Sequence, residues 1–205
     1  MRVFRVDLST TSLTKDYIMD NLPKNCLFET SKYKNTKSQY ESLVAWYVLS
    51  QALLEYYNYD ISQVQIKRNS YNKPYVDGIH FNISHSGNLV YVCISLGECG
   101  IDVQQIKDNN LLKHKEKVLN FDELTMLSLL TDIKLKKEYI TKVFCKKEAY
   151  FKLVGTGLNK ENFVDYVAFD TIDFIVSDSL NNSYALSIAQ HGIDIKDVTI
   201  MEVNI

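Results

Sequence analysis

Alternating and helical patterns of apolar residues divide the first half of the chain into strands and one long helix. Arg2–Leu8 alternates apolar and polar side chains and predicts a strand, whereas Ser38–Tyr57 carries apolar residues at helical spacing. Val64–Lys67 predicts a further short strand. Three more strands are expected in close order, at His80–Ser84, Leu89–Leu96 and Gly100–Gln104. The segment beginning at Leu89 is apolar on both faces, which predicts a central, buried strand.

The second half begins with helices and ends with strands. Val118–Leu130 predicts a helix, and Lys134–Val154 predicts a long amphipathic helix that ends at Gly155 as a C-cap. Three late strands are expected, at about 167–176, 184–189 and 198–203. Because strands and helices are grouped, the order predicts an α+β fold rather than an alternating parallel sheet. The chain divides into two parts of similar plan, residues 1–106 and 107–205.

The composition indicates a folded chain without a general affinity for polyanions. Its 205 residues are 46% hydrophobic, which suits one large domain or two small ones. The net charge of −2 argues against general binding to nucleic acid, although a local basic site can still hold a phosphate-bearing ligand. No apolar run reaches the ~18 residues of a membrane span, and the N-terminus lacks the apolar region of a signal peptide. We therefore expect a cytoplasmic protein with no nucleic-acid or membrane partner.

The cysteines do not form a recognisable metal motif. Cys26, Cys93, Cys99 and Cys145 contain no C-x-x-C pair and are not paired with a histidine at ligand spacing. A zinc site is therefore not expected. Free, mostly buried thiols in a reducing compartment explain them better.

Two acidic residues in separate segments are candidates for metal chemistry. Phe144, Glu148 and Lys152 are spaced i, i+4, i+8 and share one stripe of the long helix. Taken alone, this pattern is more often a solvent-exposed ion pair. Asp102 ends an apolar strand after Gly100 and can face a cleft, although such an acid is more often a turn or cap residue. Two carboxylates from separate elements can together hold Mg²⁺, which prefers oxygen ligands.

Phe81–Gly87 ends a strand with hydroxyl groups, an imidazole and a glycine, a set that can donate hydrogen bonds to phosphate oxygens. Taken alone, such a segment is more often an ordinary strand-end turn. Ser84 and His85 do not predict a hydrolase pair, because neighbouring side chains of a strand face opposite sides and no G-x-S-x-G elbow is present. The chain also lacks a Walker A loop and a G-x-G-x-x-G motif.

The order of these segments is more specific than any one of them. Asn72-Lys-Pro-Tyr is followed by Phe-Asn-Ile-Ser-His-Ser, Gly-Ile-Asp-Val, Phe-x-x-Lys-Glu-Ala-x-x-Lys and Gly155-Thr-Gly-Leu. This series, between Lys73 and Leu158, resembles the Sfp-type 4′-phosphopantetheinyl transferases. The resemblance implies two similar α/β subdomains related by a pseudo-twofold axis, each a small, mainly antiparallel sheet packed on helices. Coenzyme A and Mg²⁺ would bind between them, in a monomer.

The resemblance also implies an activity and a partner. Such an enzyme transfers the 4′-phosphopantetheine group from coenzyme A to a serine of an apo acyl or peptidyl carrier protein and releases 3′,5′-ADP. The transfer depends on Mg²⁺. Carrier docking is expected on the basic stretch Leu111–Lys117 and on the apolar face around Phe121, Leu124 and Leu127, although a solvated charge run beside a core-facing helix also explains these residues.

Individual residues take roles by matching the family motifs. Asp102 and Glu148 match the Mg²⁺ ligands, and Glu148 also matches the general base for the incoming serine. Lys152 matches the lysine that stabilises the leaving phosphate. The matching contacts to the phosphates and to coenzyme A are Ser84, His85 and Lys73.

Two departures from the family pattern bear on the site. Gln104 stands where many members have a second acid, so it is expected to ligate Mg²⁺ weakly or through water. Glu41 stands where many members have a basic residue. The 3′-phosphate of coenzyme A would then depend on Lys34 or Lys37.

Two other functions fit the chain less well. One is a non-catalytic carrier-protein or nucleotide-binding module, and the other is a phosphohydrolase that acts on coenzyme A without a carrier.

Overall fold

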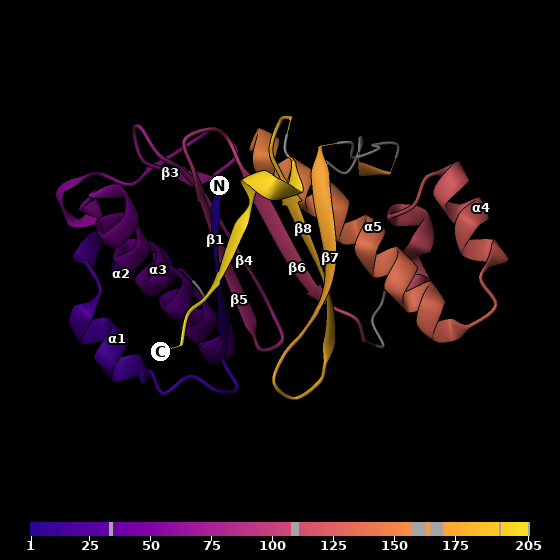
Figure 1. Ribbon diagram of the computed structural model, residues 1–205, viewed down its shortest axis with the longest axis horizontal. Coiled ribbons are helices and arrows are strands. Elements are labelled where there is room, and N and C mark those ends of the chain that lie inside the picture. The colour runs from indigo at the N-terminus through magenta and orange to yellow at the C-terminus, as the bar shows by residue number, and fades with distance from the viewer. Residues whose placement is uncertain (33–34, 108–110, 157–162, 165–169, 193, 205) are drawn as a thin grey trace.

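The computed structural model describes residues 1–32, 35–107, 111–156, 163–164, 170–192 and 194–204 (Figure 1). The first half contains β1 (Arg2–Asp7), α1 (Lys15–Asn21), α2 (Lys24–Thr30), α3 (Thr36–Tyr57), the 3₁₀ helix η1 (Ile61–Gln63), β2 (Lys67–Arg68), β3 (Pro74–Tyr75), β4 (His80–Ser86), β5 (Leu89–Ser95) and β6 (Gly100–Gln105). The second half contains η2 (Leu112–Lys117), α4 (Phe121–Leu129), α5 (Ile133–Val154), β7 (Thr171–Ser177), β8 (Ser183–Ala189), η3 (Ile195–Asp197) and β9 (Thr199–Glu202).

Two mainly antiparallel sheets form the centre of the molecule. The first has the strand order β4-β5-β1-β9, and only its β1–β9 pair is parallel. The second has the order β6-β8-β7 and is antiparallel throughout. Each half contributes one helix of 22 residues, α3 or α5. These features confirm the predicted α+β fold with two similar halves. The division at residues 106/107 stays a prediction, and β9 crosses it to pair with β1.

The two sheets share a core and are covered by helices on their outer sides. Val90, Val92 and Ile94 of β5 pack into a core with α3, while the alternate residues of β5 pack against β6 and β8. Every residue of β5 is buried, which confirms the prediction of a central strand. Figure 1 shows the resulting layers, with α3 beside the first sheet and α5 beside the second.

Capping residues define both long helices. The Asn35 side chain accepts hydrogen bonds from the N–H groups of residues 37 and 38 at the start of α3, and Asp132 does the same for residues 134 and 135 of α5. Gly155 ends α5 with a left-handed φ of 71°, where glycine has no steric penalty. The predicted C-cap is therefore confirmed, and the next residues of the motif, 157–158, lie outside the described residues.

Several boundaries differ from the predicted ones. The strand expected at Val64–Lys67 is reduced to Lys67–Arg68. Helix α4 starts at Phe121 rather than Val118, because Asn120 forms a capping box with Glu123. The short helices α1 and α2 were not predicted, because 7 residues give too little periodicity to recognise. The start of the late strand expected at 167–176 lies outside the described residues.

Several polar groups are buried inside this framework. The Lys147 ammonium donates to Glu123 Oε2 at 2.7 Å and to the carbonyls of Val118 and Val164 at 2.8 and 2.9 Å, so it ties α4 and its flanking segment to α5. Lys147 is thus satisfied by an ion pair and two carbonyls, as a buried charge requires.

All four cysteines are buried free thiols, as predicted. No helix in the described parts of the chain has the length and apolar character needed to cross a membrane.

Asp178 connects the turns of the two sheets. Its Oδ2 accepts hydrogen bonds from the Asn88 side chain at 3.0 Å and from the Tyr184 hydroxyl at 2.8 Å. Burial raises its pKa, but hydrogen bonds from Asn182, Tyr184 and Asn88 outweigh burial and lower the pKa to about 2. The carboxylate therefore stays charged and holds the β4–β5 turn against the β7–β8 turn.

Gly100 allows α5 to approach β6 closely. A Cβ atom at this position would lie 2.0 Å from the Ala149 carbonyl oxygen and 2.5 Å from the Leu153 nitrogen. Both atoms belong to the helix backbone and cannot move aside as a flexible side chain could. The glycine of the Gly-Ile-Asp motif is therefore required for the packing that brings β6 and α5 together.

We predict that Gly100→Ala lowers the free energy of unfolding by about 3 kcal/mol, because overpacking forces the backbone apart. Urea unfolding followed by circular dichroism measures the change. Gly97→Ala is the matched control, since its Cβ would meet only the flexible Gln190 side chain, at 3.3 Å. Equal stability of the two variants would show that the close contact is not needed.

Candidate active site

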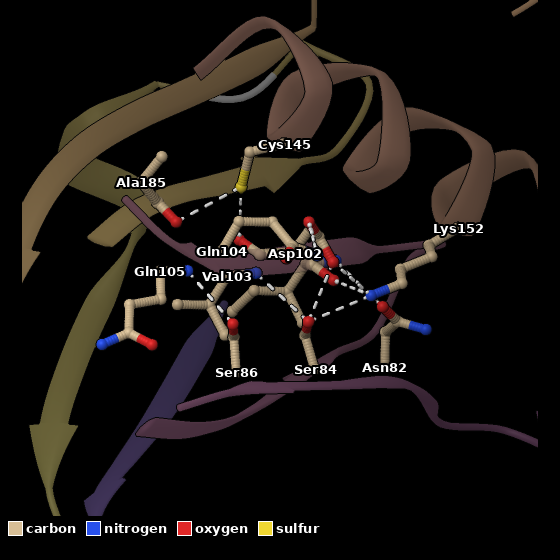
Figure 2. A network of polar contacts seen from close by, with 11 residues as sticks. Asn82, Ser84, Ser86, Asp102, Val103, Gln104, Gln105, Cys145, Lys152 and Ala185 are labelled. Atoms are coloured by element: carbon tan, nitrogen blue, oxygen red, sulfur yellow. Dashed lines mark hydrogen bonds and ion pairs between the residues drawn. The ribbon is translucent and has the colours of Figure 1, made fainter. Parts of the chain in front are cut away.

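Strand β4 is joined to β6, which belongs to the other sheet, by side chains rather than by a backbone ladder. Alternate residues of β4 point toward β6, and each accepts a hydrogen bond from a backbone N–H of that strand (Figure 2). The pairs are Asn82 Oδ1 with the Ile101 N–H (3.0 Å), Ser84 Oγ with the Val103 N–H (3.1 Å) and Ser86 Oγ with the Gln105 N–H (3.0 Å). We call these three pairs the β4–β6 seam. The side-chain oxygens of β4 thus satisfy backbone N–H groups at the edge of β6, which a further strand would otherwise pair.

Ser84 has no hydrogen-bonding capacity left over. Its hydroxyl donates to Asp102 Oδ1 at 2.9 Å and accepts from the Val103 N–H and from the Lys152 ammonium, the latter at 3.1 Å. A hydroxyl has one hydrogen and two lone pairs, so all three are used. Ser84 thus connects the seam to the charged groups of the site. The sequence predicted that Ser84 contacts phosphate directly. To donate to a phosphate oxygen, its hydroxyl would have to give up the hydrogen bond to Asp102 Oδ1.

Asp102 and Lys152 form an ion pair at the base of the site (Figure 2). Lys152 Nζ lies 2.6 Å from Asp102 Oδ1 and also donates to the Ile101 carbonyl at 3.1 Å, while Gln104 Nε2 donates to Asp102 Oδ2 at 3.2 Å. Burial alone lowers the pKa of Lys152, but the Asp102 carboxylate outweighs burial and raises it. The lysine therefore remains a cation.

Glu148 is unusually easy to protonate. It lies one turn before Lys152 on α5. Burial, together with the negative charge of Asp102, raises its pKa to about 7, while Lys152 acts in the opposite direction. A carboxyl group that titrates near neutral pH is suited to accept and release a proton.

These side chains line one cleft with a volume of about 570 Å³. Six of the residues predicted from sequence are brought together there, namely Ser84, His85, Asp102, Gln104, Glu148 and Lys152. The cleft also reaches α3 through Ser42 and Trp46. Segments from β4, β6 and α5, distant in sequence, thus converge on one concave surface.

The predicted lysines outside this group lie elsewhere. Lys73 donates from Nζ to the carbonyls of Cys99 (3.2 Å), Lys152 (2.5 Å) and Leu153 (3.3 Å), so it caps the C-terminal end of α5. Its predicted contact to coenzyme A does not fit this position, because the ammonium is held by backbone oxygens. Lys37 is 63% exposed and lies 3.8 Å from Glu41, outside the cleft lining. Lys34 lies outside the described residues.

A second charged cluster in the cleft was not predicted. The buried Glu29 carboxylate of α2 pairs with Lys32 at 2.8 Å and with the Arg68 guanidinium, and all three residues line the cleft. Arg68 also donates to the Asn72 side chain at 3.2 Å. Lys32 falls in the short basic loop visible in the sequence, but nothing local distinguishes Arg68. Only the fold brings them together.

Two sequence models match the chain. One, of the 4′-phosphopantetheinyl transferase superfamily, matches residues 98–199, and the other, of the N-terminal part of 4′-phosphopantetheinyl transferases, matches residues 14–96. A holo-[acyl-carrier-protein] synthase of Bacillus cytotoxicus is 33% identical over 108 residues, which is 44% of this chain and 91% of that protein. The chain belongs to the 4′-phosphopantetheinyl transferase superfamily. The predicted family resemblance is thereby confirmed.

Longer relatives belong to the same superfamily. The 4′-phosphopantetheinyl transferase gsp of Aneurinibacillus migulanus is 28% identical over 144 residues, 70% of this chain and 60% of gsp. The 4′-phosphopantetheinyl transferase Sfp of Bacillus subtilis is 26% identical over 133 residues, 62% of this chain and 58% of Sfp. The chain thus spans less than two thirds of these two relatives. Their likeness supports the Sfp type.

The raised pKa of Glu148 predicts that, without bound metal, the free energy of unfolding of the protein depends on pH. The folded state keeps the proton up to pH of about 7, whereas the unfolded state loses it near the ordinary value of 4.5. Stability should therefore fall between these pH values, by on the order of 2 kcal/mol from this group. Urea unfolding at several pH values should show a smaller fall in Glu148→Gln. Parallel curves for the two proteins would contradict the assigned pKa.

Proposed function

We propose that the chain transfers the 4′-phosphopantetheine group of coenzyme A to a serine of an apo carrier protein and releases 3′,5′-ADP. The observation that carries this proposal is the convergence of Asp102, Glu148 and Lys152 in one cleft of a 4′-phosphopantetheinyl transferase superfamily member. The name of the Bacillus cytotoxicus relative, holo-[acyl-carrier-protein] synthase, supports a carrier protein as the acceptor.

The residues of the cleft fit a divalent metal ion. Two carboxyl groups, those of Asp102 and Glu148, line the same cleft. Burial and, after it, the charge of Asp102 raise the pKa of Glu148. Among the described residues, no group of three or more His, Cys, Asp or Glu could hold a metal. Mg²⁺ commonly uses one or two carboxylates together with substrate phosphates and waters. Asp102 and Glu148 would be its ligands, with Gln104 as a neutral neighbour, and the bound ion would neutralise charge on the diphosphate.

Glu148 is the proposed general base. The carrier serine attacks the phosphorus next to the pantetheine arm, and Glu148 accepts the hydroxyl proton as the new P–O bond forms. The bond from that phosphorus to the bridging oxygen breaks, and 3′,5′-ADP leaves with the electron pair. Glu148 lines the cleft together with Asp102 and Lys152, so its carboxylate is placed to take the proton of a serine that enters there.

Lys152 stabilises the negative charge that develops on the leaving phosphate. Its ammonium is oriented by three acceptors, Asp102 Oδ1, Ser84 Oγ and the Ile101 carbonyl. A fixed cation at the reacting phosphates lowers the barrier without the cost of reorganising solvent. The seam supports this role because Ser84 and Ile101 belong to it and Asp102 is hydrogen-bonded to Ser84.

The Lys32–Arg68 end of the cleft is the best candidate for the remaining phosphate of coenzyme A. Both cations line the cleft, whereas Lys37 does not. Arginine suits phosphate because its guanidinium presents paired donors. The 3′-phosphate would then compete with Glu29 for these two groups. This assignment replaces Lys37 as the proposed contact, and the role of Lys34 stays a prediction.

The carrier-docking surface is proposed on α4 and the basic segment before it. Phe121 and Leu129 are 82% and 69% exposed, whereas Leu127 is buried and Leu124 is partly buried. Of the three apolar residues expected on this face, Phe121 points outward, whereas Leu124 and Leu127 pack inward and Leu129 is exposed instead. Lys113, Lys115 and Lys117 are exposed on η2 and suit an acidic carrier protein. The monomeric state and the cytoplasmic location stay predictions.

The proposed activity is tested by intact-protein mass spectrometry of apo-carrier proteins incubated with the chain, coenzyme A and Mg²⁺. We expect the carrier to gain one phosphopantetheine group, and we expect chelation of the metal to prevent the gain. Glu148→Gln should reduce the rate by ~10²–10⁴-fold through loss of the base. Glu138→Gln, on the same helix but outside the cleft, is the matched control and should retain transfer.

Other outcomes would identify another activity. Coenzyme A bound but transferred to no carrier would favour a binding module. Coenzyme A cleaved without a carrier would favour a phosphohydrolase. Normal transfer by Glu148→Gln would contradict its role as base.

Gln104→Glu should lower the Mg²⁺ concentration needed for half-maximal transfer. The new carboxylate would lie beside Asp102, where Gln104 Nε2 now donates, and would add a charged oxygen ligand. Steady-state rates measured across a Mg²⁺ titration test this. An unchanged titration would place residue 104 outside the metal site.

A further inference from the structure

Glu41 is a buried carboxylate that takes no part in the proposed transfer step. It lies on α3, and only 7% of its side chain is exposed. Its Oε2 atom lies 3.0 Å from Nδ1 of His85, a residue of β4 that lines the cleft. Glu41 itself does not line the cleft. It can therefore act on a ligand in the cleft through His85.

The imidazole is the main partner of this carboxylate. Among the described residues, Lys37 also pairs with Glu41, but it lies 3.8 Å away and is largely exposed, so solvent screens the interaction. A buried carboxylate requires a hydrogen-bond donor, and a 3.0 Å separation from Nδ1 provides one if that nitrogen carries the proton. The contact thus selects the Nδ1-protonated ring and fixes its orientation.

The orientation of the His85 ring matters because His85 lines the cleft. Ser84, the preceding residue, is fixed in the β4–β6 seam and bonded to Asp102. The His85 side chain lies on the opposite face of the strand, in contact with Glu41 of α3, and Ser84 and His85 both line the same cleft. Burial lowers the pKa of His85, and the charge of Glu41 opposes that shift. With the ring held from α3, the imidazole is presented to the cleft in one orientation.

We propose that Glu41 is a positioning residue that orients His85 toward the phosphate-bearing donor substrate. The inference rests on the proposed function for the identity of that substrate, coenzyme A. Because Glu41 acts on binding rather than on the reacting phosphorus, its loss raises KM for coenzyme A and leaves kcat nearly unchanged. Glu41 thus extends the functional site to α3 through its contact with His85 of β4.

Steady-state kinetics with a saturating apo-carrier protein test the coupling. We expect Glu41→Ala to raise KM for coenzyme A about tenfold, as for loss of one charge-assisted hydrogen bond, with kcat changed less than about twofold. In a His85→Ala background, Glu41→Ala should have no further effect on KM. Glu41→Gln, whose amide oxygen still accepts from Nδ1, should recover much of the loss. Glu55→Ala, an exposed acid of the same helix, is the matched control.

Nitrogen NMR of the His85 ring provides a readout that needs no activity. The wild-type protein should show a protonated Nδ1, and Glu41→Ala should lose that preference. An unprotonated Nδ1 in the wild type, or equal effects of Glu41→Ala with and without His85, would overturn the inference. Wild-type protein that modifies no carrier would refute the proposed function instead, and the NMR result would still decide the role of Glu41.

Discussion

The hydrogen bonds of the β4–β6 seam hold the site together. Two separate sheets meet where β4 side chains, instead of a neighbouring strand, satisfy the N–H groups of β6. Direct pairing would merge the sheets at a spacing of about 4.8 Å, whereas the seam inserts a layer of polar side chains between them. Ser84 belongs to that layer and also bonds Asp102 and Lys152. The same interaction that joins the halves thus positions the charged groups between them.

The charged groups of the cleft depend on one another. Asp102 keeps Lys152 protonated, whereas burial and, after it, the charge of Asp102 raise the pKa of Glu148, so the site holds a fixed cation beside a carboxyl group that is harder to ionise. A catalytic site needs both kinds of group with different proton affinities, and their mutual arrangement creates the difference. Gly100 makes this possible at the backbone level, because any larger residue would separate β6 from α5. Structure and proposed chemistry therefore rest on the same short segment, Gly100–Asp102.

The sequence predicted the long elements and the acidic centre, because these depend on local periodicity and on an ordered series of motifs. The motif series selected Asp102, Glu148 and Lys152, which the structure brings together in one cleft, while their catalytic roles stay predictions. It could not show that the Lys73 ammonium caps α5, or that Ser84 is saturated by protein partners, because those facts depend on contacts between segments. Arg68 and Glu29 were missed for the same reason. Helix α2 is too short for its pattern to be recognised, and Arg68, the partner of Glu29 on that helix, lies 39 residues away in the chain.

We propose that Asp102 and Glu148 form a divalent metal site when coenzyme A is bound. Electron paramagnetic resonance of Mn²⁺, which prefers the same oxygen ligands as Mg²⁺, tests it directly. With coenzyme A present, the wild-type protein should bind Mn²⁺, and Asp102→Asn and Glu148→Gln should each weaken binding strongly. Asp173→Asn, which alters an acid outside the cleft lining, should bind as the wild type does. Unchanged Mn²⁺ binding by Asp102→Asn would show that Asp102 is not a metal ligand.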